Sequence, residues 1–204
     1  MNIDIILEHL YIVLVSVLVT IVLGLPLGVF AYMNKRARSI VLWIVDILQT
    51  IPALALLGII MIIFGAGKIT VISGLVLYSL LPIVRNTFVG LNEIDPAIKK
   101  AATGMGMSKL YRLFHVEIPI AFPIIFTGIR IATVTSIGVA VFAAFVGGGG
   151  LGSVIYRGIH IQDMKLIMFG TFSLMGMAVL FDGVMAYIEK KLYRKKSTLQ
   201  NQKS

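Results

Sequence analysis

Side chains capable of chemistry are few in this chain of 204 residues. Its nine Asp and Glu residues are scattered, so no paired-carboxylate or Ser/His/Asp arrangement stands out. His9, His115 and His160 are too far apart in sequence for a local metal motif, and there is no cysteine to supply a thiolate or a disulfide. We therefore expect no catalytic residue and no metal site.

Two glycine-rich stretches imitate nucleotide-binding motifs. Residues 147–152 satisfy the GxGxxG pattern, but a dinucleotide fingerprint requires a preceding strand and a soluble βαβ unit, whereas an apolar run precedes this one. Residues 65–68 lack both ends of a phosphate-binding loop, because Ile62 and Ile69 stand where a glycine and a Ser or Thr are needed. We therefore expect this chain to bind no nucleotide or other cofactor.

The polar stretch from Glu93 to Pro123 has the features of a helix–turn–helix. Asp95 is a suitable N-cap, and Pro96 suits the first position of a helix. This helix should run to about Thr103 and end at a glycine that permits a left-handed turn, either Gly104 or Gly106.

Ser108 is then expected to cap a second short helix. Ala101 and Ala102 have minimal side chains, so another protein could approach the first helix closely. These residues alone leave two interpretations open: a partner-docking helix, or an amphipathic re-entry loop with no partner.

The remainder of the chain is apolar enough to lie in a lipid bilayer. Hydrophobic residues make up 58%, charged residues 13%, and the mean hydropathy is +0.99, well beyond a typical soluble domain. A membrane-spanning helix needs about 20 mainly apolar residues. Five runs qualify, at about 10–33, 40–64, 69–91, 118–146 and 165–188. The sequence therefore predicts an all-α membrane protein.

Lysine and arginine predict the orientation of these spans. Thirteen of them fall on one side, in the loop near 35–38, in the segment 93–117 and in the tail 190–204, and three fall on the other. Because cytoplasmic loops are enriched in Lys and Arg, we expect the N-terminus outside and the C-terminus inside. The basic tail is interpreted as an anchor at anionic lipid rather than a nucleic-acid site. Trp43, Tyr32 and Tyr187 lie near span ends, as in an interfacial aromatic belt.

Several residues inside the predicted spans are unusual for lipid. The prolines Pro26, Pro52, Pro82 and Pro123 should bend their helices, either for packing or to shape a pathway. Ionisable groups in a span face a partner or a water-filled cavity, and the sequence leaves both roles open for Asp46, Arg85, Arg130 and Asp182.

The stretch from Glu93 to Pro123, which includes the expected coupling segment 93–117, resembles the EAA motif of ABC-importer permeases. That motif reads Glu-Ala-Ala, three residues, Gly, nine residues, Ile, any residue, Leu-Pro. The spacing agrees throughout, with one departure: Lys100 occupies the position of the Glu. The matching residues are Ala101, Ala102, Gly106, Val116, Ile118 and Pro119.

The resemblance implies a coupling helix that begins at Pro96 and docks on a separate ATP-binding subunit, which would carry ATP and Mg²⁺. It further implies a second permease subunit, identical or related, and an extracytoplasmic substrate-binding protein. The chain would then be a non-catalytic transport subunit in a bacterial cytoplasmic membrane. Its permease domain, residues 1–189, would have the five-helix core of the type I, methionine-importer-like permeases.

Two further runs resemble permeases for glycine betaine, carnitine and choline. The first is DxxQTIPxLA, which includes Asp46, Gln49, Thr50 and Pro52, and the second is the glycine-rich segment with Gly147, Gly149 and Gly152. These residues are our candidates for the pathway or gate. The expected function is ATP-driven import of osmoprotectants. The alternatives are the same machinery carrying an amino acid such as methionine, or a secondary transporter or channel.

Overall fold

The computed structural model describes residues 3–201, and side chains over 3–193. Its regular elements are all helical. In chain order they are α1 (Ile3–Met33), α2 (Lys35–Thr50), α3 (Ala53–Phe64), α4 (Lys68–Asn92), α5 (Pro96–Gly104), α6 (Lys109–Arg112), the π-helical η1 (Leu113–Glu117), α7 (Ile118–Val139), the 3₁₀-helical η2 (Ala140–Val146), α8 (Leu151–His160) and α9 (Met164–Asn201).

Four described stretches are long and apolar enough to cross a membrane: Ile3–Met33, Lys68–Asn92, Lys109–Val146 and Met164–Tyr193. The predicted span at 40–64 is wrong as a continuous helix, because α2 and α3 meet at an angle of 101°. Pro52 therefore does not lie inside a helix. It follows Ile51, whose backbone is extended, as expected for a residue held out of the helical region by the proline ring after it.

Other boundaries also differ from the prediction. The helix around 118–146 already begins at Lys109, and α9 continues past residue 188. Residues 151–160 form α8, a helix that was not predicted, because ten residues are too few to be recognised as a membrane span. Pro26, Pro82 and Pro123 do lie inside helices, as predicted.

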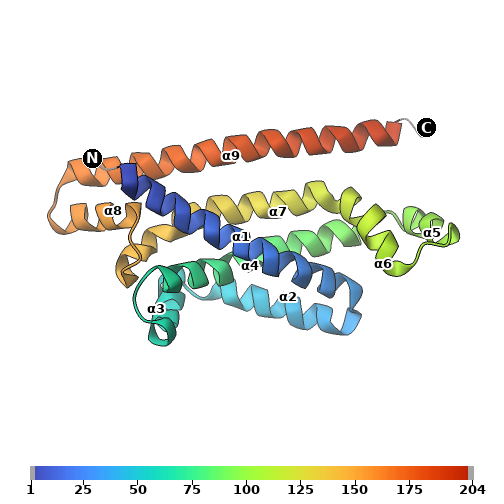
Figure 1. Cartoon of the computed structure of the whole chain (residues 1–204), viewed down its shortest axis with the longest axis horizontal. Coiled ribbons are helices and arrows are strands. Elements are labelled where there is room, and N and C mark those ends of the chain that lie inside the picture. Colours follow the sequence, from blue (N-terminus) through green and yellow to red (C-terminus); the bar gives the residue numbers. More distant parts are fainter. Residues whose placement is uncertain (1–2, 202–204) are drawn as a thin grey trace.

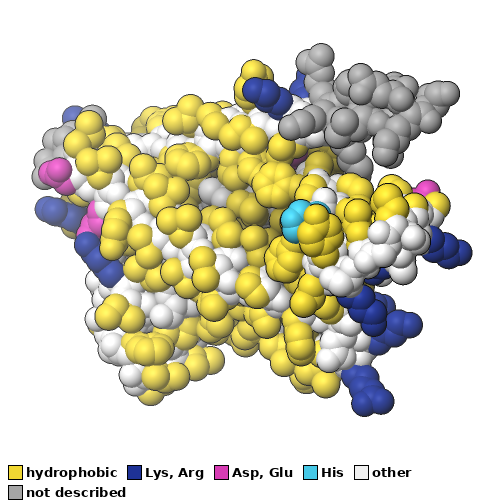
Figure 2. Space-filling view, turned by 45° about the vertical axis from the view of Figure 1, so that its right-hand side comes forward, with side chains coloured by type: hydrophobic (Ala, Val, Ile, Leu, Met, Phe, Trp, Pro, Cys, Tyr) yellow, Lys and Arg dark blue, Asp and Glu magenta, His cyan; other side chains and the backbone are white. Residues whose placement is uncertain are grey.

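The long helices run along the molecule and separate two ends (Figure 1). α3, α8 and the start of α1 lie at one end, and α5 and α6 lie at the other. Apolar side chains cover the middle of the surface, and the visible Lys and Arg side chains gather mainly toward the end that carries α5 (Figure 2). This separation agrees with the predicted orientation, in which the end with α5 faces the cytoplasm.

α4 is the central helix, and glycines let its neighbours approach closely. A Cβ on Gly24 or Gly28 of α1 would lie 2.9 Å from Ile83 or 2.5 Å from Thr87, both on α4. On its other side, a Cβ on Gly128 of α7 would lie 2.6 Å from the carbonyl oxygen of Pro82. Small residues four apart are a common means of bringing membrane helices together. The spacing of α1, α4 and α7 therefore depends on having no side chain at these points.

Substitution of Gly28 by Ala tests this packing. The new methyl would meet Thr87 at 2.5 Å and the Val84 carbonyl at 2.9 Å, so the helices would have to separate. We expect Gly28→Ala to lower the free energy of unfolding by about 1–3 kcal/mol, measured by thermal unfolding in detergent. Gly176→Ala on α9 is the matched control, because its Cβ would meet nothing within 4 Å. Equal stability of the two variants would contradict the packing argument.

Candidate functional sites at the cytoplasmic end and along the spans

The α5 segment has the local structure that its residue types predicted. The Asp95 carboxylate accepts a hydrogen bond from the Ala97 amide at 2.7 Å, and Pro96 occupies the first turn. The helix ends at Gly104, and Gly106 adopts a left-handed backbone with φ of +82°. Ser108 caps α6 through the Tyr111 amide at 3.3 Å. The second helix is not a separate short one, however, because it continues through η1 into α7.

The predicted coupling residues do not all face outward. Pro96, Lys100, Ala101 and Gly106 are exposed, whereas Ala102 is only 2% exposed. The expectation that a partner could approach both alanines is therefore wrong for Ala102, which faces the rest of the chain. The exposed surface instead includes four large apolar side chains that flank the turn: Met105, Leu110, Tyr111 and Phe114.

The remaining motif residues lie where the segment enters α7. Val116 and Ile118 are half-buried, and Ile118 packs against the cytoplasmic cluster, a group of apolar residues centred on Leu91, Ile94, Leu113, Ala121 and Ile125. Pro119 is exposed in the first turn of α7. The wider π-helical turn of η1 precedes it and is closed by a hydrogen bond from the Ile118 amide to the Leu113 carbonyl. Proline is compatible with this turn because it has no N–H to donate to the preceding turn.

A buried carboxylate in η1 was missed by the sequence analysis. Glu117 is 1% exposed, and its Oε1 accepts a hydrogen bond from Arg112 Nε at 2.6 Å. Arg112 Nη1 also donates to the Thr103 hydroxyl at 2.6 Å. The available signal was a single acid among apolar residues, in the sequence His115-Val-Glu-Ile-Pro119.

Lys99 makes a second attachment of α5. Its ammonium donates to the carbonyl of Leu91 at 2.9 Å, in the last turn of α4, and lies 5.1 Å from the ring centroid of Tyr32. Burial lowers the pKa of Lys99, although the nearby Glu117 acts in the opposite direction. Tyr32 is half-buried and packs against the cytoplasmic cluster. It therefore packs inside the protein rather than in an interfacial belt, whereas Trp43 and Tyr187 are exposed.

The first group of candidate pathway residues lies on α2 and at its break. Arg85 Nη2 on α4 lies 2.8 Å from both carboxylate oxygens of Asp46. This pair remains open, with the side chains of Arg85 and Asp46 54% and 42% exposed. Gln49 is half-buried and Pro52 is exposed at the break, while the Thr50 hydroxyl bonds back to its own helix.

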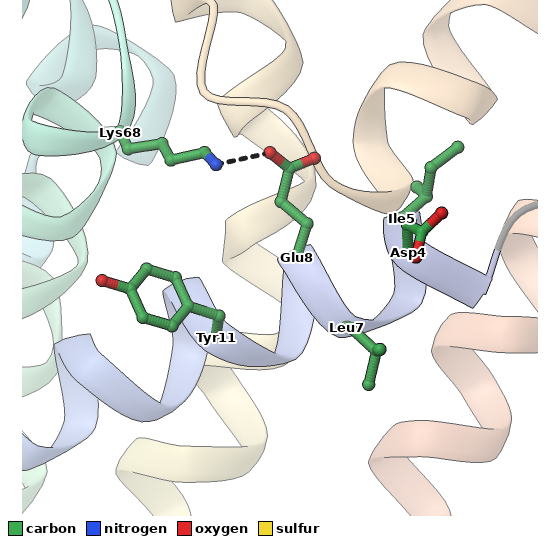
Figure 3. Close-up of a pocket in the computed structure, with 6 residues that line it drawn as sticks. All are labelled: Asp4, Ile5, Leu7, Glu8, Tyr11 and Lys68. Carbon is green, nitrogen blue, oxygen red and sulfur yellow. Dashed lines mark ion pairs between the residues drawn. The ribbon is translucent and has the colours of Figure 1, made fainter.

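The second group, on the glycine-rich turn, contacts different neighbours at the opposite end from α5. Gly149 has a φ of +79°, and a Cβ there would lie 2.6 Å from the Glu8 carboxylate. Glu8 accepts from the Gly150 amide at 2.9 Å and pairs with Lys68 at 2.7 Å. Figure 3 shows the Lys68 ammonium reaching across to Glu8 in a pocket beside α1. The turn is thus held against both α1 and the start of α4.

The other two glycines of this group are also next to protein atoms. A Cβ on Gly152 would overlap the Val141 carbonyl oxygen, and one on Gly147 would contact Ala66. Close packing therefore accounts for a small residue at position 152.

Arg130 joins α7 to α9. It pairs with Asp182 at 2.8 Å and with Glu189 at 2.6 Å, and Thr127 also bonds to Glu189. Arg130 and Asp182 were predicted to be ionisable groups inside spans, whereas Glu189, one residue past the predicted span 165–188, was not. Over the part of the chain that the structure describes, no group of three or more His, Asp or Glu side chains could hold a metal ion.

Comparison with known proteins identifies relatives over nearly the whole chain. Residues 11–194 match the family model described as "Binding-protein-dependent transport system inner membrane component". The glycine betaine/carnitine/choline transport system permease protein OpuCB of Bacillus subtilis is 39% identical over 91% of this chain and 85% of its own length. The carnitine transport permease protein OpuCD of Listeria monocytogenes is 41% identical over 87% of this chain and 80% of its own length.

Solved structures share the fold. A chain of the MetNI methionine ABC transporter, in an inward facing conformation, has a TM-score of 0.84 and 25% identity, over 92% of this chain and 94% of that one. A chain of an amino acid ABC transporter has a TM-score of 0.76 at 17% identity. These comparisons confirm the type I permease fold and the resemblance that the cytoplasmic motif indicated. The chain belongs to the family of binding-protein-dependent transport system inner membrane components.

Proposed function

We propose that this chain is the transmembrane permease subunit of an ATP-driven importer of osmoprotectants, such as glycine betaine, carnitine or choline. Its partners would be a separate ATP-binding subunit, which carries ATP and Mg²⁺, a second permease subunit, and an extracytoplasmic binding protein that delivers the solute. The solute class is supported by the names of the relatives that are 39% and 41% identical. A methionine importer is the second candidate, favoured only by the shared fold of MetNI.

The exposed surface of α5 and α6 is the observation that carries the proposal. The small residues Ala101 and Gly106 are exposed, and the large apolar side chains of Met105, Leu110 and Phe114 in the same segment are 70%, 58% and 61% exposed. Apolar side chains exposed together at one end of a protein commonly mark an interface. Because this end also carries most of the basic residues, the surface faces the cytoplasm, where ATP is available.

The Asp46–Arg85 pair supports a pathway shared with a second subunit. Both side chains are about half-exposed in the single chain, although Arg85 lies well inside α4 (Lys68–Asn92). A charged pair on a membrane-spanning helix is costly in lipid and faces a cavity or a protein neighbour. The α2–α4 face would therefore line the pathway or its interface with the second permease subunit.

Ala101→Trp tests the docking surface. The indole would project from an exposed position of α5 without disturbing the core, so we expect membrane insertion to continue and co-purification of the ATP-binding subunit to fall by at least about tenfold. Gly183→Trp on α9 is the control for bulk, because position 183 is exposed and a Cβ there would meet nothing within 4 Å. Ala102→Trp is unsuitable for this purpose, since residue 102 is buried. Undiminished co-purification of the Ala101 variant would contradict the docking assignment.

Stimulation of ATP hydrolysis tests the solute class. The assembled transporter, with its binding protein, should hydrolyse ATP faster with glycine betaine, carnitine or choline than with methionine. A transporter that responds only to methionine would replace the osmoprotectant assignment by the second candidate. Uptake driven by an ion gradient through this chain without an ATP-binding subunit would contradict the importer assignment itself.

A further inference from the structure

The α5 helix carries no acidic side chain. Lys100 stands where the resembled motif has its Glu, and the whole stretch 96–117 contains a single carboxylate, Glu117. That carboxylate is 1% exposed, so it cannot reach a partner protein. The ion pair that this stretch makes through its own carboxylate therefore lies inside the chain.

The burial of Glu117 makes its partner essential. A carboxylate removed from water is strongly disfavoured unless it is paired and hydrogen-bonded. Arg112 supplies this pairing at 2.6 Å. In a regular α-helix, residues five apart point about 140° away from each other. The π-helical turn Leu113–Glu117 changes this spacing, because its hydrogen bonds run from residue i to residue i+5 and each turn therefore holds more residues. The angle between Arg112 and Glu117 is thereby reduced, and the two side chains meet at 2.6 Å.

Arg112 extends the connection from Glu117 to α5. Its Nη1 donates to the Thr103 hydroxyl at 2.6 Å, and that hydroxyl in turn donates to the Lys99 carbonyl at 2.8 Å. The side chain of Lys99 donates to the Leu91 carbonyl at the end of α4. Two polar attachments, one to η1 and α7 and one to α4, thus fix the rotation of α5.

Apolar packing alone holds α5 weakly. Its only buried residue is Ala102, and Ile98 adds a partly buried contact with the cytoplasmic cluster. Tyr32, from the last turn of α1, also packs against this cluster and lies beside Glu117. The carboxylate is therefore placed where the ends of α1, α4 and α7 meet.

We propose that Glu117 is a positioning residue which, through Arg112 and Thr103, fixes the angle of α5 relative to α1, α4 and α7 and transmits its movement to them. The proposal rests on the proposed docking of α5 to an ATP-binding subunit. When that subunit moves α5, hydrogen bonds from charged groups resist a change of angle better than apolar contact at Ala102 and Ile98 does. The spans at α4 and α7 then move with α5, and ATP hydrolysis is linked to solute passage.

The test compares uptake with ATP hydrolysis in the assembled transporter in liposomes, using whichever of glycine betaine, carnitine, choline or methionine stimulates hydrolysis most. Thr103→Val removes the hydroxyl that accepts from Arg112 but keeps the shape and leaves the Arg112–Glu117 pair intact. We expect solute transported per ATP hydrolysed to fall by about tenfold. Thr103→Ser is the matched control, because it keeps the hydroxyl, and its ratio should equal that of the unmodified chain.

Glu117→Gln provides a second, independent variant. Glu117→Gln should also lower the solute transported per ATP hydrolysed. The double variant with Thr103→Val should have nearly the same ratio as Glu117→Gln alone, because both substitutions act on one connected network. If Glu117→Gln fails to insert into the membrane, the comparison of Thr103→Val with Thr103→Ser tests the proposal by itself. The proposal is overturned if Thr103→Val assembles normally and transports as much solute per ATP as Thr103→Ser. If the unmodified chain does not bind an ATP-binding subunit at all, the proposed function fails first and this inference falls with it.

Discussion

Close approach of helix backbones at glycines is the constraint on which the rest of the structure depends. In lipid there is little hydrophobic driving force between helices, so contact at small residues must hold them together. α4 meets α1 at Gly24 and Gly28, and meets α7 at Gly90 and Gly128. It is therefore fixed from two sides. α2 and α3 pack on its remaining surface, and the shared cytoplasmic ends of α1, α4 and α7 form the cluster from which α5 projects.

Ion pairs act on this framework as connections between helices. Arg130 joins α7 to α9 through Asp182 and Glu189. These ion pairs are important for α9, because only 11% of its most apolar stretch is buried against the rest of the chain. Lys68 and Glu8 join α4 to α1. Charged groups in or near a membrane need such partners, and pairing across helices satisfies this requirement while fixing the helices relative to one another. The Asp46–Arg85 pair joins α2 to α4, and both of its side chains remain about half-exposed in the single chain; under the proposed function, a pathway or a neighbouring subunit would cover it.

Features that depend on composition or on nearest neighbours could be predicted from the sequence. The spans and their orientation follow from hydropathy and charge, and the caps at Asp95 and Ser108 follow from adjacent backbone groups. The break at Ile51 was missed because a proline inside an apolar run can either kink a helix or end it. The burial of Ala102 and the pairing of Glu117 could not be predicted. They depend on which face of α5 packs inward and on a π-helical turn that no residue pattern specified.

The departure at Lys100 is best understood together with Glu117. A lysine on the exposed face of α5 gives that helix no carboxylate with which to hold a partner. In contrast, the segment retains one acid at a position where water cannot reach it and where an arginine and the ends of three spans converge. An exposed carboxylate contributes little to rigidity because solvent competes for it, whereas a buried and paired one cannot be released without cost. The single carboxylate of the stretch 96–117 is therefore placed to hold α5 to the spans, as proposed above, and not to contact a neighbouring protein.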